Sequence, residues 1–138
     1  MKTRLKKVGK LAFEATGDSG HTVIMDGSAN NGGADLGSRP MEMILMGLGG
    51  CSGIDVSLIL EKSRQQVTDF SIDIEGQRAD AVPAVFTDIH LHYTVTGHNL
   101  DPKKVARAVS LSMEKYCSVT RMLSHSVNIT HDFSIVAE

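Results

Sequence analysis

Polar and apolar residues alternate in two segments of the chain, at residues 70–75 and 89–96. A period of two places successive side chains on opposite faces of a strand, so both segments are predicted to be half-buried β-strands. Shorter strand-like runs at 10–15 and 21–26 flank a polar, glycine-bearing segment, which is typical of a hairpin turn. Residues 127–135 predict a last strand.

Two further segments have the patterns of helices. Pro40 suits the first position of a helix, and the apolar run behind it predicts a helix that ends at about Arg64. A second helix is predicted to begin at the pair Asp101-Pro102 and to end at Cys117, because apolar residues recur on one stripe between them.

The predicted order of elements is β-β-α-β-β-α-(α)-β, in which Ser118 caps a short third helix and residues 27–38 form a glycine-rich loop. Hairpins without strict βαβ alternation are typical of α+β folds. We therefore predict an α+β fold with largely antiparallel sheets around two long helices. A length of 138 residues fits a single domain spanning residues 1–138.

Charge and composition narrow the choice of partners and compartment. A net charge of −2 gives no general electrostatic reason to bind nucleic acid or an anionic membrane. Residues 2–10 are basic but lack the apolar stretch of a secretion signal, so they predict a solvated strand or arm. We expect a cytoplasmic protein, whose two cysteines, Cys51 and Cys117, form no permanent disulfide.

The first helix is almost long and apolar enough to cross a membrane. The run from Met43 to Leu60 holds a single charged residue, Asp55, near its middle, together with four glycines. These residues disfavour a membrane span. We expect the helix instead to be the central helix of a fold or to lie between two subunits.

Cys51 lies in the glycine-rich part of this helix, where small residues let another helix or a ligand approach the backbone. Asp55 follows one turn later and shares its face. A carboxylate beside a thiol disfavours the thiolate, so a reactive Cys51 requires a cation from another element. Glu42 precedes Cys51 by nine residues, about 900° around the helix, so it can assist Cys51 only from a partner subunit.

Two other groups are weaker candidates. Arg121, four residues after Cys117, favours a thiolate there if the helical path continues, although a structural ion pair between Arg121 and Glu114 on a solvated face is the favoured interpretation of the two charges. His90 and His92 point to the same side of a strand, but no nearby Cys, Asp or Glu completes a ligand set. We therefore predict neither a metal nor a cofactor.

Two motifs carry a resemblance to a known family: SRPMEMILMGLGGC at residues 38–51 and EKYCSVTR at residues 114–121. With the order of strands, they resemble the OsmC/Ohr family, which comprises osmotically inducible protein C and the organic hydroperoxide resistance proteins. Within it, the chain is most similar to the small YhfA-like branch. The resemblance covers essentially the whole chain and implies an intertwined homodimer with apolar central helices and two sites at the subunit interface.

The resemblance also implies a thiol-dependent peroxidase that reduces organic hydroperoxides in oxidative or osmotic stress defence. Cys51 takes the peroxidatic position and becomes a sulfenic acid on attacking the O–O bond. Cys117 then condenses with it to a disulfide, which an external dithiol of the lipoyl or thioredoxin type reduces.

Two positions depart from the family pattern. Family peroxidases carry a glutamate directly after the proline, where this chain has Met41 and then Glu42. They also use an arginine after the first strand, and residues 16–20 contain none. We expect Arg39 of the partner's helix to substitute for it. The departures leave an alternative open: an OsmC-like dimer without efficient peroxidase activity that binds an apolar small molecule.

Overall fold

A computed structural model describes all 138 residues of the chain, which form two compact units, Met1–Ile44 and Leu45–Glu138. The first unit holds an antiparallel sheet of three short strands, β1 (Thr3–Lys7), β2 (Phe13–Gly17) and β3 (Thr22–Met25). The predicted hairpin is confirmed as β2 and β3. The basic amino end, predicted as a solvated strand or arm, forms the exposed strand β1, which is missing only from the predicted order of elements.

The loop after β3 is organised by Asp26, whose side chain is buried. Its carboxylate accepts three backbone hydrogen bonds of 2.7 to 3.1 Å, from the N–H groups of Gly27, Ala34 and Leu36. Burial disfavours the ionised carboxyl, but these hydrogen bonds outweigh it and hold the pKa of Asp26 below its usual range. The loop includes a 3₁₀ turn, η1 (Ala29–Asn31), and leads into the first long helix.

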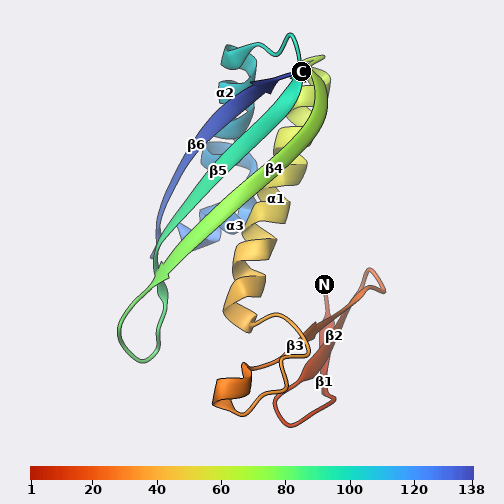
Figure 1. Cartoon of the computed structure of the whole chain (residues 1–138), viewed down its shortest axis with the longest axis vertical. Coiled ribbons are helices and arrows are strands. Elements are labelled where there is room, and N and C mark those ends of the chain that lie inside the picture. The colour runs from red at the N-terminus through yellow and green to blue at the C-terminus, as the bar shows by residue number, and fades with distance from the viewer. The chain divides into compact units, whose positions relative to one another are not determined.

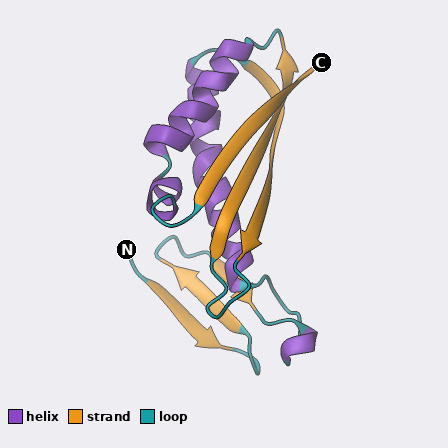
Figure 2. Ribbon diagram, turned by 90° about the vertical axis from the view of Figure 1, so that its left-hand side faces the viewer, coloured by secondary structure: helices purple, strands orange, loops and turns teal.

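The second unit is built on a three-stranded sheet with the order β4 (Gln66–Arg78), β5 (Phe86–His98), β6 (Asn128–Ala137). β4 and β5 are antiparallel, whereas β6 runs parallel to β5. Helices cover one face of this sheet (Figure 1, Figure 2). The predicted α+β class with largely antiparallel sheets is confirmed, and the pairing of β5 with β6 is the parallel exception.

Helix α1 (Pro40–Lys62) has nearly the bounds that the sequence predicts. Within the second unit, every fourth residue of α1 from Leu48 onward is buried. These residues, Leu48, Ser52, Val56 and Leu60, form a stripe along the helix. Residues four apart lie on one helical face. This stripe and the buried side chains of the central strand β5 form much of the core, at about 1.5–3 kcal/mol for each large aliphatic side chain.

By length and composition, α1 also meets the requirements of a membrane span, with a mean hydropathy of 1.8. It is the one helix of the chain that does so. The buried stripe is typical of a core helix, but the opposite side of α1 stays apolar and exposed at Met46, Ile54 and Leu58. Neighbouring exposed apolar side chains are typical of surfaces at which proteins bind other molecules.

The glycines of α1 have two different surroundings. A methyl group on Gly49 would lie 2.4 Å from Cδ1 of Ile74, and one on Gly53 would lie 3.4 Å from Cδ1 of Ile72. These two glycines therefore let the helix lie close to strand β4, rather than to another helix of the chain. A methyl group on Gly47 or Gly50 would meet nothing within 4 Å, so that side of the helix is open to a partner.

The end of the second predicted helix is wrong. Helix α2 (Pro102–Leu111) stops six residues before Cys117 and is followed by a π-helical turn, η2 (Ser112–Tyr116). The backbone N–H of Cys117 donates to the carbonyl of Ser112, five residues earlier, which closes this wider turn. Cys117 is then extended, and it caps the short helix α3 (Ser118–Leu123) in place of Ser118.

Candidate functional site

Cys51 and Asp55 occupy one face of α1, as their spacing predicts, and both are half-buried. Cys117 comes from a distant part of the chain, where the π-helical turn η2 delivers it between α2 and α3. Its thiol is buried. The three residues therefore meet through the packing of α1 against the η2–α3 segment.

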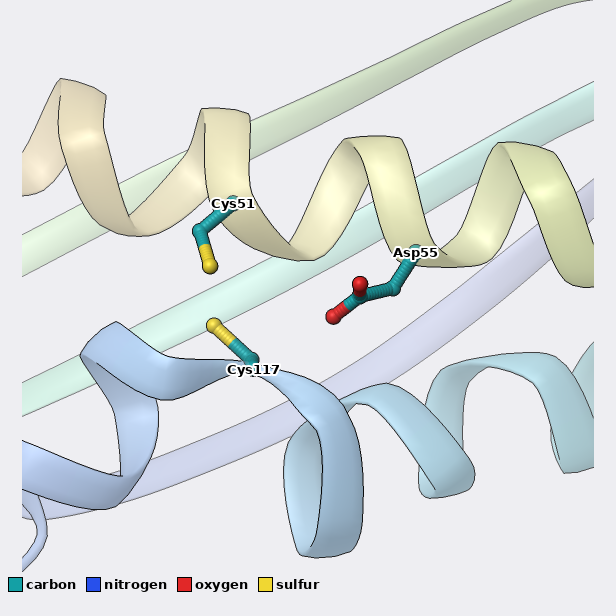
Figure 3. Close-up of side chains that lie close together, drawn as sticks. All are labelled: Cys51, Asp55 and Cys117. Carbon is teal, nitrogen blue, oxygen red and sulfur yellow. The ribbon is translucent and has the colours of Figure 1, made fainter.

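The two thiols point toward one another, with the Asp55 carboxylate beside them (Figure 3). Both cysteines are free, and the two Sγ atoms and a carboxylate oxygen of Asp55 all lie within 4.8 Å of one another. A disulfide requires a separation of about 2.05 Å, so the two sulfurs have to move closer before they can bond. The pairing of Cys51 with Cys117 in a disulfide stays a prediction.

A chain of buried hydroxyl groups leads to Asp55 from the sheet. Tyr93 Oη lies 2.6 Å from Ser52 Oγ, which lies 2.8 Å from Ser112 Oγ. Ser112 in turn donates to Asp55 Oδ2 at 3.1 Å. A carboxylate only accepts hydrogen bonds, so Ser112 donates to Asp55. Ser52 therefore donates to Ser112, and Tyr93 donates to Ser52.

The sequence analysis did not predict this chain of buried hydroxyl groups. Ser52 and Ser112 are fully buried, although serine is most often exposed, and each lies on the apolar stripe of its own segment. A polar residue at a core position requires a hydrogen-bond partner, and this was the available signal. The partners themselves are 41 and 60 residues away from Ser52.

Burial raises the pKa of Tyr93 to about 12, and the Ser52 hydrogen bond opposes this only in part. The pKa of the Cys117 thiol is also raised, chiefly by burial. The Thr120 hydrogen bonds lower it, and the neighbouring Cys51 raises it further. The continuous helical path on which the role of Arg121 depended is not formed, because Cys117 is an extended residue that precedes α3. Arg121 also forms no ion pair with Glu114.

Two cavities adjoin the site. A cavity of about 670 Å³ lies between the η2–α3 segment and the start of β6, and Cys117 and Arg121 are among the residues that line it. A second cavity, of about 490 Å³, extends from Asp55 along α1 and α2. Its wall combines apolar side chains with the cations Lys62 and Arg107. Neither cation forms a salt bridge with Asp55.

The other two predicted site residues, Arg39 and Glu42, belong to the first unit. Arg39 pairs with Asp35 at 2.7 Å and donates to the carbonyl of Gly37. Glu42 accepts a hydrogen bond of 2.9 Å from the backbone N–H of Arg39 and so caps the start of α1. Their roles toward Cys51 stay predictions.

His90 and His92 do have an acidic neighbour, contrary to the sequence interpretation. Strand β6 places Asp132 beside them, with its Oδ1 atom 3.0 Å from His90 Nε2 and 2.7 Å from His92 Nδ1. The hydroxyls of Thr130 and Ser134 contact the remaining ring nitrogens. Both histidines hold the pKa of Asp132 below its usual range by hydrogen bonding.

Known proteins are similar to this chain over almost its whole length. The family model for OsmC-like protein matches residues 32–132. Protein YhfA of Escherichia coli K12 is 50% identical over 137 residues, 99% of each chain. A hypothetical protein of Aquifex aeolicus is 31% identical, with a TM-score of 0.88 over 99% of this chain and 96% of that one. An organic hydroperoxide resistance protein OsmC of Legionella pneumophila shares the fold, with a TM-score of 0.71, 17% identity and 97% of each chain covered.

The buried hydroxyl chain yields a test with a matched control. Replacing Tyr93 by Phe removes one hydroxyl and leaves Ser52 without its donor, so the free energy of unfolding should fall by about 1–3 kcal/mol. The other tyrosine, Tyr116, is half exposed, and its hydroxyl makes no hydrogen bond, so Tyr116→Phe should change stability little. Urea denaturation measures both values. Equal free energies of unfolding of the two variants would contradict a stabilising role of the buried hydroxyl groups.

The wild-type protein and Tyr93→Phe, compared by urea denaturation at different pH values, also test the raised pKa of Tyr93. A folded pKa of about 12, above the ordinary value near 10, means that Tyr93 contributes stability fully below pH 10 and loses it as the pH rises toward 12. The wild-type protein should therefore lose its advantage over Tyr93→Phe in that window.

Proposed function

The chain belongs to the OsmC-like protein family, and from this membership we propose that it is a thiol-dependent peroxidase that reduces organic hydroperoxides in oxidative or osmotic stress defence. The observation that carries the proposal is the approach of two free thiols from distant segments, with their Sγ atoms within 4.8 Å. We expect the cycle to run in the cytoplasm, where dithiol reductants keep cysteines reduced.

Cys51 is the proposed peroxidatic residue because it is the less buried of the two. Its thiolate attacks the O–O bond of the hydroperoxide, forms a sulfenic acid and releases the alcohol. The Cys117 thiol then attacks the sulfenic sulfur, forms the disulfide and expels water. A lipoyl-type or thioredoxin-type dithiol reduces this disulfide by exchange and becomes oxidised itself. The raised pKa of Cys117 suits the resolving role, because a thiol that stays protonated does not compete for the peroxide.

Arg39 of a partner subunit is our proposed cation for the Cys51 thiolate. Its ion pair with Asp35 is no obstacle, because Asp35 is largely exposed and such surface pairs contribute at most about 1 kcal/mol. Glu42 holds the backbone of Arg39 at the start of α1 and is proposed to orient it. This arrangement answers the need that Asp55 creates for a positive charge near Cys51.

A homodimer is proposed on the same grounds. The apolar exposed side of α1 includes Ile54, which is 65% exposed, and Gly47 and Gly50 leave open space beside it. A second copy of this helix covers both features at once. Small residues at such a crossing let two helices approach closely.

The cavity beside Asp55 supports an alternative function. Leu58, Ile59, Leu111 and Tyr116 line it together with Lys62 and Arg107, so it suits an apolar molecule with an anionic end. On this alternative the protein binds such a molecule and has no efficient peroxidase activity.

Single-cysteine variants test the peroxidase cycle. The reduced wild-type protein should consume cumene hydroperoxide continuously with dihydrolipoamide, while Cys51→Ser should consume none. Cys117→Ser should take up one equivalent of peroxide per chain and keep a sulfenic acid, which dimedone labels and mass spectrometry detects. A wild-type protein that consumes no peroxide, and that carries an apolar ligand in native mass spectrometry, would overturn the peroxidase in favour of the binding module.

The role of Arg39 predicts a rate effect. Removing a cation that stabilises developing negative charge costs on the order of 100-fold, so Arg39→Ala should lower kcat/KM for the hydroperoxide by about that factor. Arg4→Ala, an exposed substitution in β1, is the control and should retain the wild-type value. The assignment fails if the two arginine variants have the same kcat/KM.

Gly50→Ala distinguishes a covered helix face from an open one. In an exposed helix, alanine is more stable than glycine by about 1 kcal/mol, so an unpartnered α1 should gain stability. If a second α1 packs on this face, the added methyl group should instead weaken the dimer. Analytical ultracentrifugation of wild type and variant measures the dissociation constant. A monomeric wild-type protein, stabilised by the substitution, would contradict the dimer.

A further inference from the structure

Three potential metal ligands converge at the site: the Sγ atoms of Cys51 and Cys117 and a carboxylate oxygen of Asp55, all within 4.8 Å of one another. We propose that the reduced protein binds a thiophilic divalent cation, with Zn²⁺ as the best match, through these three atoms and a water molecule. The proposal does not rest on peroxidase activity, because it concerns only the reduced thiols.

The donor set is typical of zinc. Zn²⁺ binds cysteine sulfur at about 2.3 Å and carboxylate oxygen at about 2.0–2.2 Å in a tetrahedron, and sites with three protein ligands keep the fourth position for water. Such a tetrahedron separates two sulfurs by about 3.8 Å, and a sulfur from an oxygen by about 3.5 Å. Because the three atoms of Cys51, Asp55 and Cys117 already lie within 4.8 Å, side-chain shifts on the order of 1 Å close the site.

The placement of the ligands along the chain also fits a metal site. Cys51 and Asp55 present two ligands four residues apart on one face of α1, the spacing that helical metal sites use. Cys117 supplies the third from the junction of η2 and α3, which lies across from that face (Figure 3).

Outer hydrogen bonds hold two of the ligands in place. Ser112 donates to Asp55 Oδ2 and so orients the carboxylate. The backbone N–H of Thr120 donates to Cys117 Sγ at 3.4 Å. Metal-bound carboxylates and thiolates generally have such partners, which fix their orientation. Ser112 is itself held by Ser52, so the carboxylate is supported from the core.

Charge supplies a further argument. Metal binding removes both thiol protons, and the resulting two thiolates and the carboxylate repel one another unless a cation lies between them. Asp55 forms no salt bridge, and Lys62 and Arg107 only line the cavity next to it. A divalent cation offsets most of the combined charge of these three ligands.

The cluster of His90, His92 and Asp132 is a poorer candidate. All four ring nitrogens already contact a hydroxyl or the Asp132 carboxylate. A metal ion there has to displace these hydrogen bonds on an exposed strand face. The cysteine site requires no such loss.

Binding has a defined stoichiometry and a consequence for the thiols. One Zn²⁺ replaces the two thiol protons of Cys51 and Cys117, which leave to the solvent. No electron is transferred, so a chelator reverses the reaction. While the ion is bound, both sulfurs use their lone pairs as ligands, and oxidation to a disulfide removes the site.

The test titrates Zn²⁺ into the reduced, metal-free, full-length protein by calorimetry, in parallel with Co²⁺ as a spectroscopic substitute. We expect one ion per chain and a thiolate-to-cobalt charge-transfer band in the near ultraviolet. Asp55→Asn should weaken binding at least about 10-fold, a loss that even an outer-shell substitution can cause. Asp73→Asn, which changes an exposed aspartate of β4, is the matched control and should bind as wild type does.

Two further forms of the protein test where the ion binds. The disulfide form should bind no Zn²⁺ at this site, and the double variant His90→Gln, His92→Gln should bind one ion as before. The proposal is overturned if Asp55→Asn binds as tightly as wild type, if the disulfide form retains the ion, or if the protein binds none. Peroxide consumption by the same metal-free protein is measured separately, so a failed peroxidase and a failed metal site give different results.

Discussion

The packing of α1 against the η2–α3 segment is the constraint on which the site depends. It places the Cys51 and Cys117 sulfurs and the Asp55 carboxylate in one small volume. The buried hydroxyls of Tyr93, Ser52 and Ser112 hold this arrangement, because they join the central strand, the long helix and the π-helical turn. Each of these hydroxyls has a partner, and the chain contains no buried polar side-chain atom without one. Any displacement of α1 therefore breaks hydrogen bonds in the core.

The sequence predicts the elements whose signals are local. The proline before a long apolar run predicts where α1 begins, and the structure starts the helix at that proline. Strict alternation of polar and apolar residues predicts β4 and β5. Strand β1 is predicted only as a solvated strand or arm, because all five of its residues are exposed and no alternation marks it. The π-helical turn escapes detection because apolar residues continue on the helical stripe through Met113, while the deciding hydrogen bond joins the backbone of Cys117 to Ser112. The expectation of a single domain stays a prediction.

The site is predictable only in part, for the same physical reason. Spacing alone places Asp55 on the face of Cys51, since both lie on one helix. The approach of Cys117 was implied by family resemblance and not by its spacing from Cys51, and the roles of Arg39 and Glu42 rest on that resemblance as well. The partners of Ser52 and Ser112, and the acid beside His90 and His92, depend on pairings between segments about 40 to 60 residues apart. A single sequence contains no direct record of such pairings.

Asp55 is the residue that sets this site apart from a simple dithiol. A carboxylate beside two sulfurs brings three potential negative charges together, whereas a peroxidatic cysteine has to react as its thiolate. A positive charge resolves this conflict, whether a guanidinium of a second subunit supplies it or a bound cation does. The two solutions exclude one another at any moment, because the metal occupies the sulfurs that a peroxide has to reach. If both occur, the cation keeps the thiols reduced and unreactive, and its loss is the step that exposes Cys51 to peroxide.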